Sequence, residues 1–120
     1  MGQNEYEIWT KQLWDGVTLA QNGTLTSDPI QLDRKAENWR FSFQYYFTSD
    51  GAATITAKVL TSIDGVNFID TSAAAIGSTL AKATRDHVEF DPDYCKAIKI
   101  QIDEDNVAAI TSLTAWICIS

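Results

Sequence analysis

The sequence has very little of what enzyme active sites and metal sites are usually built from. Among 120 residues there are one histidine and two cysteines, too few for a tetrahedral zinc site. His87 stands beside Asp86 and Glu89, but a catalytic role would need a nucleophile and an orienting carboxylate to converge on it. No nucleophile-elbow pattern occurs, so we expect a surface histidine and a protein with no catalytic residues and no cofactor.

Positive charge is also scarce. Nine lysines and arginines stand against sixteen aspartates and glutamates, which gives a formal net charge of −7. The basic residues are scattered, and their longest run is Arg34-Lys35. Because nucleic-acid binding needs clustered basic side chains against the phosphates, we expect no nucleic acid among the partners.

Long apolar runs are absent as well. No stretch approaches the ~18 apolar residues of a membrane-spanning helix. Residues 1–5 lack the basic and apolar regions of a signal peptide, and Tyr6 stands where a myristoylation signal has serine or threonine. We therefore expect that the protein does not associate with membranes. We also expect it to be made in a cytoplasm, where Cys95 and Cys118 would be free thiols.

What the sequence does have is alternation of apolar and polar residues. A period of two indicates a strand with one buried face, and it predicts strands over 38–48 and 53–63. Between them, Ser49-Asp50-Gly51 predicts a three-residue hairpin loop with a left-handed Gly51, which sets Phe47 opposite Ala53 in one sheet. The expected buried positions are Trp39, Phe41, Phe43, Tyr45, Phe47, Ala53, Ile55, Ala57 and Val59.

Turn signals divide the rest of the chain. Asn22-Gly23 predicts a tight turn, and Pro29 interrupts the strand begun at Leu25, which indicates an edge or a bend. Asp64-Gly65 predicts a second tight hairpin. Residues 71–85 are rich in alanine, serine and threonine, and we expect them to form a long surface loop.

Three alternating stretches follow, over 87–90, 95–103 and 111–119, with a turn at Glu104-Asp105-Asn106 between the last two. Pairing these last two would place Cys95 opposite Cys118, where a disulfide is geometrically conceivable. The expected inward residues are Val88, Phe90, Ile98, Ile100, Ile102, Leu113, Ala115, Ile117 and Ile119.

Together these patterns predict about eight strands and no substantial helix. Turn signals every ~8–12 residues are typical of an all-β, single-domain antiparallel β-sandwich, with the two hairpins at the centres of facing sheets. We expect the sandwich over 15–120, after a turn at Trp14-Asp15-Gly16. Residues 1–14 form either its first strand or a docking arm that reaches a neighbouring subunit.

Four aromatic residues lie outside the core pattern. Tyr46 and Trp116 fall on the outward faces of their strands, while Trp9 and Trp14 lie in the ambiguous first segment. Exposed aromatics on a sandwich suit a subunit interface or the stacking of sugars. Burial under residues 71–85 or under the first segment is the alternative for Trp116.

Acidic residues gather in two turns, Asp91-Pro92-Asp93 and Asp103-Glu104-Asp105. Calcium takes oxygen ligands of this kind, but the spacing matches no EF-hand loop. Acidic turns are usually solvated, so we expect no metal.

The order of these features resembles small virion proteins of tailed bacteriophages, whose jelly-roll or galactose-binding-like sandwiches decorate capsids or build necks, tails and fibres. The resemblance spans 25–120. It is carried by residues 25–32, the aromatic strand ending in Thr48-Ser49-Asp50-Gly51, the hairpin over 62–68, and the stretches 96–100 and 116–119.

The resemblance implies a non-enzymatic virion protein, made in the host bacterial cytoplasm, that self-associates and docks on other virion proteins. Similar strands occur in carbohydrate-binding modules. A carbohydrate-binding β-sandwich that stacks sugars on Trp116, Tyr46 or Trp14 is therefore the alternative function.

Overall fold

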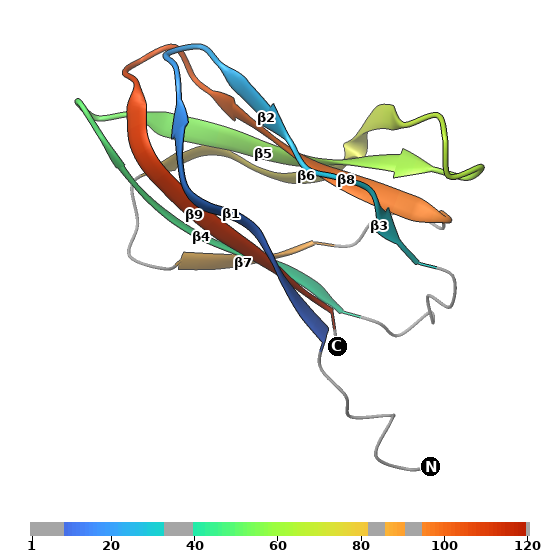
Figure 1. The fold of residues 1–120 in the computed structure, drawn as a ribbon. Helices are drawn as coiled ribbons and strands as arrows, with labels where there is room; N and C mark the ends of the chain where they lie inside the picture. The colour runs from blue at the N-terminus through green and yellow to red at the C-terminus, as the bar shows by residue number, and fades with distance from the viewer. Residues whose placement is uncertain (1–8, 33–39, 82–85, 91–94, 120) are drawn as a thin grey trace.

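In the computed structural model, which describes residues 9–32, 40–81, 86–90 and 95–119, strands pack as two antiparallel sheets face to face (Figure 1). Sheet A has the order β1-β9-β4-β7, and sheet B the order β2-β8-β5-β6, with β3 also paired to β8. The predicted all-β sandwich is confirmed. The strands are β1 Trp9–Leu19, β2 Thr24–Thr26, β3 Ile30–Gln31, β4 Phe41–Ser49, β5 Thr54–Ser62, β6 Ile69–Ala81, β7 Asp86–Phe90, β8 Ala97–Glu104 and β9 Ile110–Ile119.

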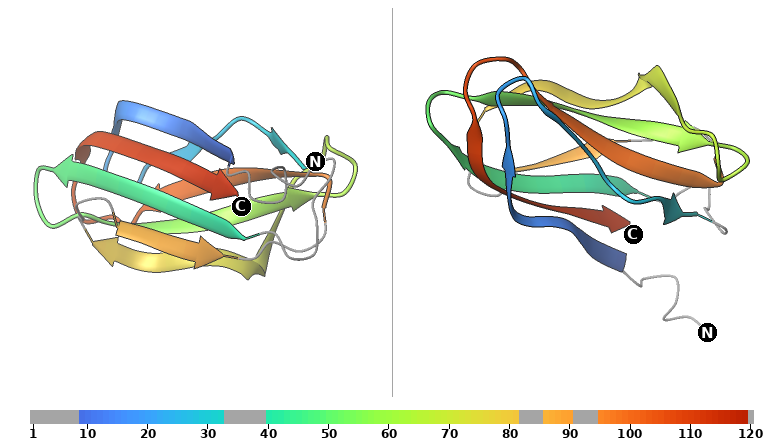
Figure 2. Two further views of the ribbon diagram at one scale, coloured as in Figure 1. Left: turned by 90° about the horizontal axis from the view of Figure 1, so that it is seen from below. Right: turned by 45° about the horizontal axis from the view of Figure 1, so that its top comes forward.

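The pairing is nested. The first strand pairs with the last, β2 and β3 pair with β8, β4 pairs with β7, and β5 pairs with β6. The chain is therefore one long hairpin that is rolled up, and rolling adds the β4–β9 and β5–β8 pairs (Figure 2). This arrangement is the jelly roll, a double-sheet fold built from two Greek keys.

The predicted interruption at Pro29 is confirmed at the edge of sheet B. β2 and β3 occupy one strand position, broken over 27–29, beside β8. In the break, the Ser27 Oγ accepts the Ile100 N–H at 2.9 Å, and the Ser27 N–H reaches the Ile100 carbonyl at 2.8 Å. A side chain thus satisfies a buried backbone donor where the ladder fails.

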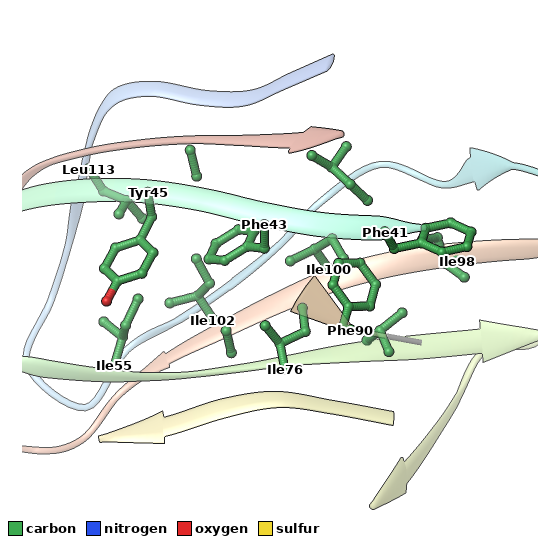
Figure 3. Packing of buried hydrophobic residues seen from close by; sticks show 14 of the residues in the cluster. Phe41, Phe43, Tyr45, Ile55, Ile76, Phe90, Ile98, Ile100, Ile102 and Leu113 are labelled. Carbon is green, nitrogen blue, oxygen red and sulfur yellow. The ribbon is translucent and has the colours of Figure 1, made fainter. Parts of the chain in front are cut away.

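Aromatic side chains from sheet A fill the interior against aliphatic ones from sheet B. Phe43 is fully buried and Tyr45 is 1% exposed. From β4, Phe43 points toward Ile102 and Tyr45 points toward Ile55 (Figure 3). Fully burying one such side chain contributes about 1.5–3 kcal/mol. The predicted inward residues of β4, β5, β8 and β9 are confirmed, and so are Phe90 and the partly buried Val88 of β7. Trp39, also predicted inward, lies outside the described residues.

The predicted hairpin of β4 and β5 is wrong. β4 pairs with β9 and β7 in sheet A, whereas β5 pairs with β8 and β6 in sheet B, so residues 50–53 cross between the sheets. Gly51 is not among the residues with positive φ. Alternation decides which face of a strand is buried, but not which strand lies beside it. Phe47 and Ala53 are both buried in either arrangement.

The predicted pairing of β8 with β9 is wrong for the same reason. Cys118 lies in sheet A, paired with Thr10 and Ser42, whereas Cys95 precedes β8 of sheet B. The register that would bring the two cysteines together therefore does not exist, and they form no disulfide with each other.

The surface loop predicted over 71–85 is also wrong, because β6 spans Ile69–Ala81. β6 is an edge strand, and its pairing with β5 has three register shifts. Its described contribution to the interior is Ile76, 7% exposed, and the partly buried Leu80. The three register shifts break any regular alternation of inward and outward residues along β6, so the sequence shows no period of two there. Residues 82–85 lie outside the described residues.

The turn predicted at Trp14-Asp15-Gly16 is instead an irregularity inside a continuous strand. β1 runs through it with register shifts on both sides of Trp14, and Gly16 takes a φ of 66°. The expected boundary between residues 14 and 15 thus falls within β1. Residues 1–8 lie outside the described residues, so a docking arm there stays a prediction.

Candidate interaction surfaces

Tyr46 and Trp116 come together on the outer face of sheet A. They belong to neighbouring strands, β4 and β9, and their ring centroids lie 6.0 Å apart with the ring planes inclined by 32°. Both rings are half-buried, because the sheet covers one side of each. Trp116 is flanked by two amide side chains in register, Gln12 on β1 and Gln44 on β4.

Trp14 does not belong to this group. It pairs with Ala115, whose side chain points into the sandwich, and it packs against the core beside Leu13 and Val17. Trp14 therefore closes one side of the interior. Trp9 pairs through its backbone with Ile119 at the start of β1. The structure brings together two of the four predicted aromatics, Tyr46 and Trp116.

A second surface feature is the β5–β6 connection, which sequence reasoning predicted as a hairpin but not as an apolar surface. The hairpin is confirmed, with Thr61 paired to Ile69. Three aliphatic side chains on it are largely in solvent: Ile63 at 85%, Val66 at 76% and Ile69 at 61% exposure. We call these three residues the hairpin tip. The missed signal was apolar residues directly flanking the turn at Asp64-Gly65.

The hairpin tip is ordered by Asp64. Its Oδ1 accepts the N–H groups of Val66 and Asn67, each at 2.8 Å, and its Oδ2 accepts the Asn67 side-chain amide at 2.8 Å. These donors, first of all the Asn67 and Val66 N–H groups, hold the pKa of Asp64 well below its ordinary value. Gly65 supplies the positive φ, 81°, that the turn requires.

At the opposite end of the sandwich, Glu104 ties the β1–β2 connection to the β8–β9 connection. It is 2% exposed, and its carboxylate accepts the N–H groups of Asn22, Asn106, Val107 and Ala108 at 2.6–3.2 Å. Burial opposes ionisation of this carboxyl group, but the four donors outweigh it and hold the pKa of Glu104 below its ordinary value. The Asp50 N–H also reaches the Ala109 carbonyl at 3.0 Å.

In the acidic turn that was weighed as a calcium site, the carboxylate oxygens accept hydrogen bonds from protein groups. Besides Glu104, the Asp105 carboxylate accepts the hydroxyls of Thr54 and Thr56, each at 2.7 Å. Among the described residues, no group of three or more His, Cys, Asp or Glu side chains could hold a metal ion. Asp91-Pro92-Asp93 lies outside the described residues.

His87 can be placed only by its backbone, which pairs with Gln44, because its side chain lies outside the described part of the chain. Over that same part, no helix combines the length and apolar character that a membrane crossing requires.

The central strands of sheet B carry charged residues, whereas β4 and β9 at the centre of sheet A contain none. Lys58 on β5 bonds Asp70 at 3.0 Å and lies 3.7 Å from Asp103. The hydrogen bond to Asp70 is the main cause that raises the pKa of Lys58, against the opposing effect of burial. Lys99 on β8 lies over the Phe68 ring, 4.5 Å from its centroid.

Solved viral structures share this fold. The VP2 protein in the infectious bursal disease virus subviral particle matches with a TM-score of 0.63 at 14% identity, over 94% of this chain and 32% of VP2. A structure of the viral particle of the same virus matches with a TM-score of 0.64 at 12% identity, over 94% of this chain and 30% of that one. This chain thus spans about a third of the length of those viral proteins.

A second match covers both proteins almost completely. The SPBc2 prophage-derived protein YomS has a TM-score of 0.52 at 10% identity, over 95% of this chain and 96% of YomS. No protein-family model matches the sequence, and no curated protein matches it. The structural matches agree with the strand order in showing a jelly-roll-like sandwich of the kind found in viral capsids.

Proposed function

We propose that this protein is a non-enzymatic structural subunit of a bacteriophage virion, which acts by associating with copies of itself and with neighbouring virion proteins. The observation that carries the proposal is the nested strand order, with its likeness to VP2 in viral particles. The likeness to a prophage-derived protein of similar length supports a bacteriophage origin and, with it, synthesis in a bacterial cytoplasm.

The hairpin tip is the contact that we assign to association. Ile63, Val66 and Ile69 are exposed in the single chain, and removing apolar surface from water contributes about 25 cal/mol per Å². Because Asp64 already fixes the loop, little conformational freedom is lost when the tip is buried.

The size of the hairpin tip indicates how copies meet. Three aliphatic side chains cover less than the ~800 Å² per partner of a typical stable interface. One tip against one neighbour is therefore too small to hold two copies together. Several tips that converge on a symmetry axis would bury one another jointly, as in closed cyclic oligomers. Since each copy carries a net charge of −7, salt should strengthen the association by screening repulsion.

Sedimentation velocity on the purified protein tests the proposal. We expect wild-type protein to form a discrete oligomer. The triple variant Ile63→Ser, Val66→Ser, Ile69→Ser should shift it to monomer with an unchanged circular dichroism spectrum. The matched control is Val107→Ser at the opposite end, where Val107 is 50% exposed, and it should leave the oligomer intact. A wild-type protein that stays monomeric at every concentration and salt level would refute self-association.

A further inference from the structure

The outer face of sheet A carries a binding platform of its own. Gln12, Trp116 and Gln44 form one row across β1, β9 and β4. Tyr46 lies beside Trp116 from the next outward position of β4, with the two ring planes inclined by 32°. Since neighbouring strands lie about 4.8 Å apart, the two glutamines are roughly 10 Å apart, on either side of the indole. All four residues stand on paired strands, so the platform is fixed by backbone hydrogen bonds.

The two central strands of the platform are uncharged. β4 and β9 contain no charged residue, whereas the edge strands β1 and β7 carry Lys11, Asp15, Asp86, His87 and Glu89, and His87 pairs through its backbone with Gln44. The central strands of sheet B instead carry Lys58, Lys99, Asp103 and Glu104. Within the described residues the fold has two layers, and no strand lies over the outer face of sheet A.

These two properties define the ligand. Aromatic ring faces pack against the C–H faces of a pyranose ring, and side-chain amides donate to and accept from its hydroxyl groups. A nucleic acid could also stack on the rings, but its phosphates would need basic groups, which β4 and β9 do not supply. A subunit interface would also bury the two rings, and the test below includes it as an outcome that overturns the proposal.

We propose that Tyr46 and Trp116 form a stacking platform for a neutral oligosaccharide, with Gln12 and Gln44 hydrogen-bonding to its hydroxyl groups. The platform lies on the outer face of sheet A, whereas the hairpin tip belongs to the β5–β6 connection of sheet B. Glycan binding and self-association are therefore separate properties of the subunit, carried by separate residues, and each can fail without the other.

The test is a titration of the purified protein with cellohexaose, maltohexaose and chitohexaose, followed by tryptophan fluorescence and calorimetry. Polygalacturonate serves as the anionic comparison. We expect saturable binding of at least one neutral oligosaccharide. Trp116→Ala and Tyr46→Ala should each weaken it about tenfold or more, the usual scale for loss of one stacking contact. Trp116→Phe, which keeps a ring, should weaken it less.

Matched controls separate the platform from the rest of the surface. Gln44→Ala should weaken binding severalfold. Gln101→Ala removes the same amide from β8, where Gln101 bonds Thr26, and should have no effect. Trp14→Phe, which changes the tryptophan that packs against the core, should also leave affinity unchanged.

The proposal is overturned if no neutral oligosaccharide binds, if only polygalacturonate binds, or if the Trp116 and Tyr46 variants bind as tightly as wild type. It is also overturned if Trp116→Ala dissociates a wild-type oligomer that binds no glycan, because the face would then be a subunit interface. The sedimentation result for the hairpin tip has no bearing on any of these outcomes.

Discussion

At the scale of residues, buried polar side chains hold the connections where strand pairing stops. Ser27 accepts a buried N–H at the break between β2 and β3, and Glu104 gathers four N–H groups at the end of β8. An unpaired buried donor costs about 1–3 kcal/mol. Each of these two side chains therefore stabilises the fold by satisfying buried N–H groups, and single substitutions can test each contribution.

Glu104→Gln should destabilise the protein by about 2–4 kcal/mol at neutral pH, because hydrogen bonds to a charged acceptor are replaced and an amide N–H₂ meets backbone N–H donors. Urea denaturation measures this loss. The matched control is Asp103→Asn, one position earlier, where the side chain is 34% exposed. Since exposed ion pairs contribute little, the control should lose less than about 1 kcal/mol.

The same substitution should change the pH dependence of stability. The folded pKa of Glu104 lies below its ordinary value of 4.5, so the unfolded chain binds this proton more tightly. Its contribution to stability is complete above the unfolded pKa and is lost as the pH falls through the folded pKa. Wild type should therefore lose more free energy of unfolding between neutral pH and the acid range than Glu104→Gln does. Equal losses would contradict this role.

The sequence predicts well whether a residue points inward or outward, but it predicts poorly which strand lies beside it. Phe43, Ile100 and Ile117 point inward as expected, because burial of one strand face is written into the alternation of that strand alone. The pairing of Tyr46 with Trp116 depends on β4 lying beside β9, 70 residues away in the chain. No local pattern records that neighbour, so the platform could not be separated from Trp14 by sequence.

At the scale of elements, β6 is where local sequence and structure differ most. An apolar alternation forms when one face of a strand is covered by the opposite sheet along its length. β6 lies at the edge of sheet B with three register shifts, so Ile76 is its main described anchor in the core. The β6 residues that pair with β5 show no alternating hydrophobic pattern: they are Ile69, Asp70, Ala75, Gly77, Leu80 and Ala81.

This difference gives a test of β6 as a strand. Ile76→Ala should destabilise the protein by about 2–4 kcal/mol, as for other buried isoleucines cut to alanine. Ile69→Ala removes the same atoms from the same strand at a position that is 61% exposed, and should change stability by less than about 0.5 kcal/mol. Thermal or urea unfolding of the two variants compares them directly. Equal effects would mean that residues 71–81 form a surface loop after all.

At the scale of the whole molecule, the nested pairing joins the two ends of the described chain, with Trp9 opposite Ile119. Such distant contacts form only after long loops are closed, so folding should be slow, on the order of milliseconds to seconds. The nesting also has a functional consequence. It leaves the hairpin tip, the outer face of sheet A and the Glu104 connections on separate parts of one rigid body, each open to change without the others.

Strand order is the premise of the proposed virion role, since it defines the fold in which this chain is similar to the viral proteins. The most direct test is the set of backbone nuclear Overhauser effects between strands in an isotope-labelled sample. The jelly roll predicts cross-strand effects between Phe43 and Ile117 and between Phe43 and Val88. Effects between Phe43 and Ala57 instead would show β4 and β5 as a hairpin in one sheet, and would contradict the fold and the function built on it.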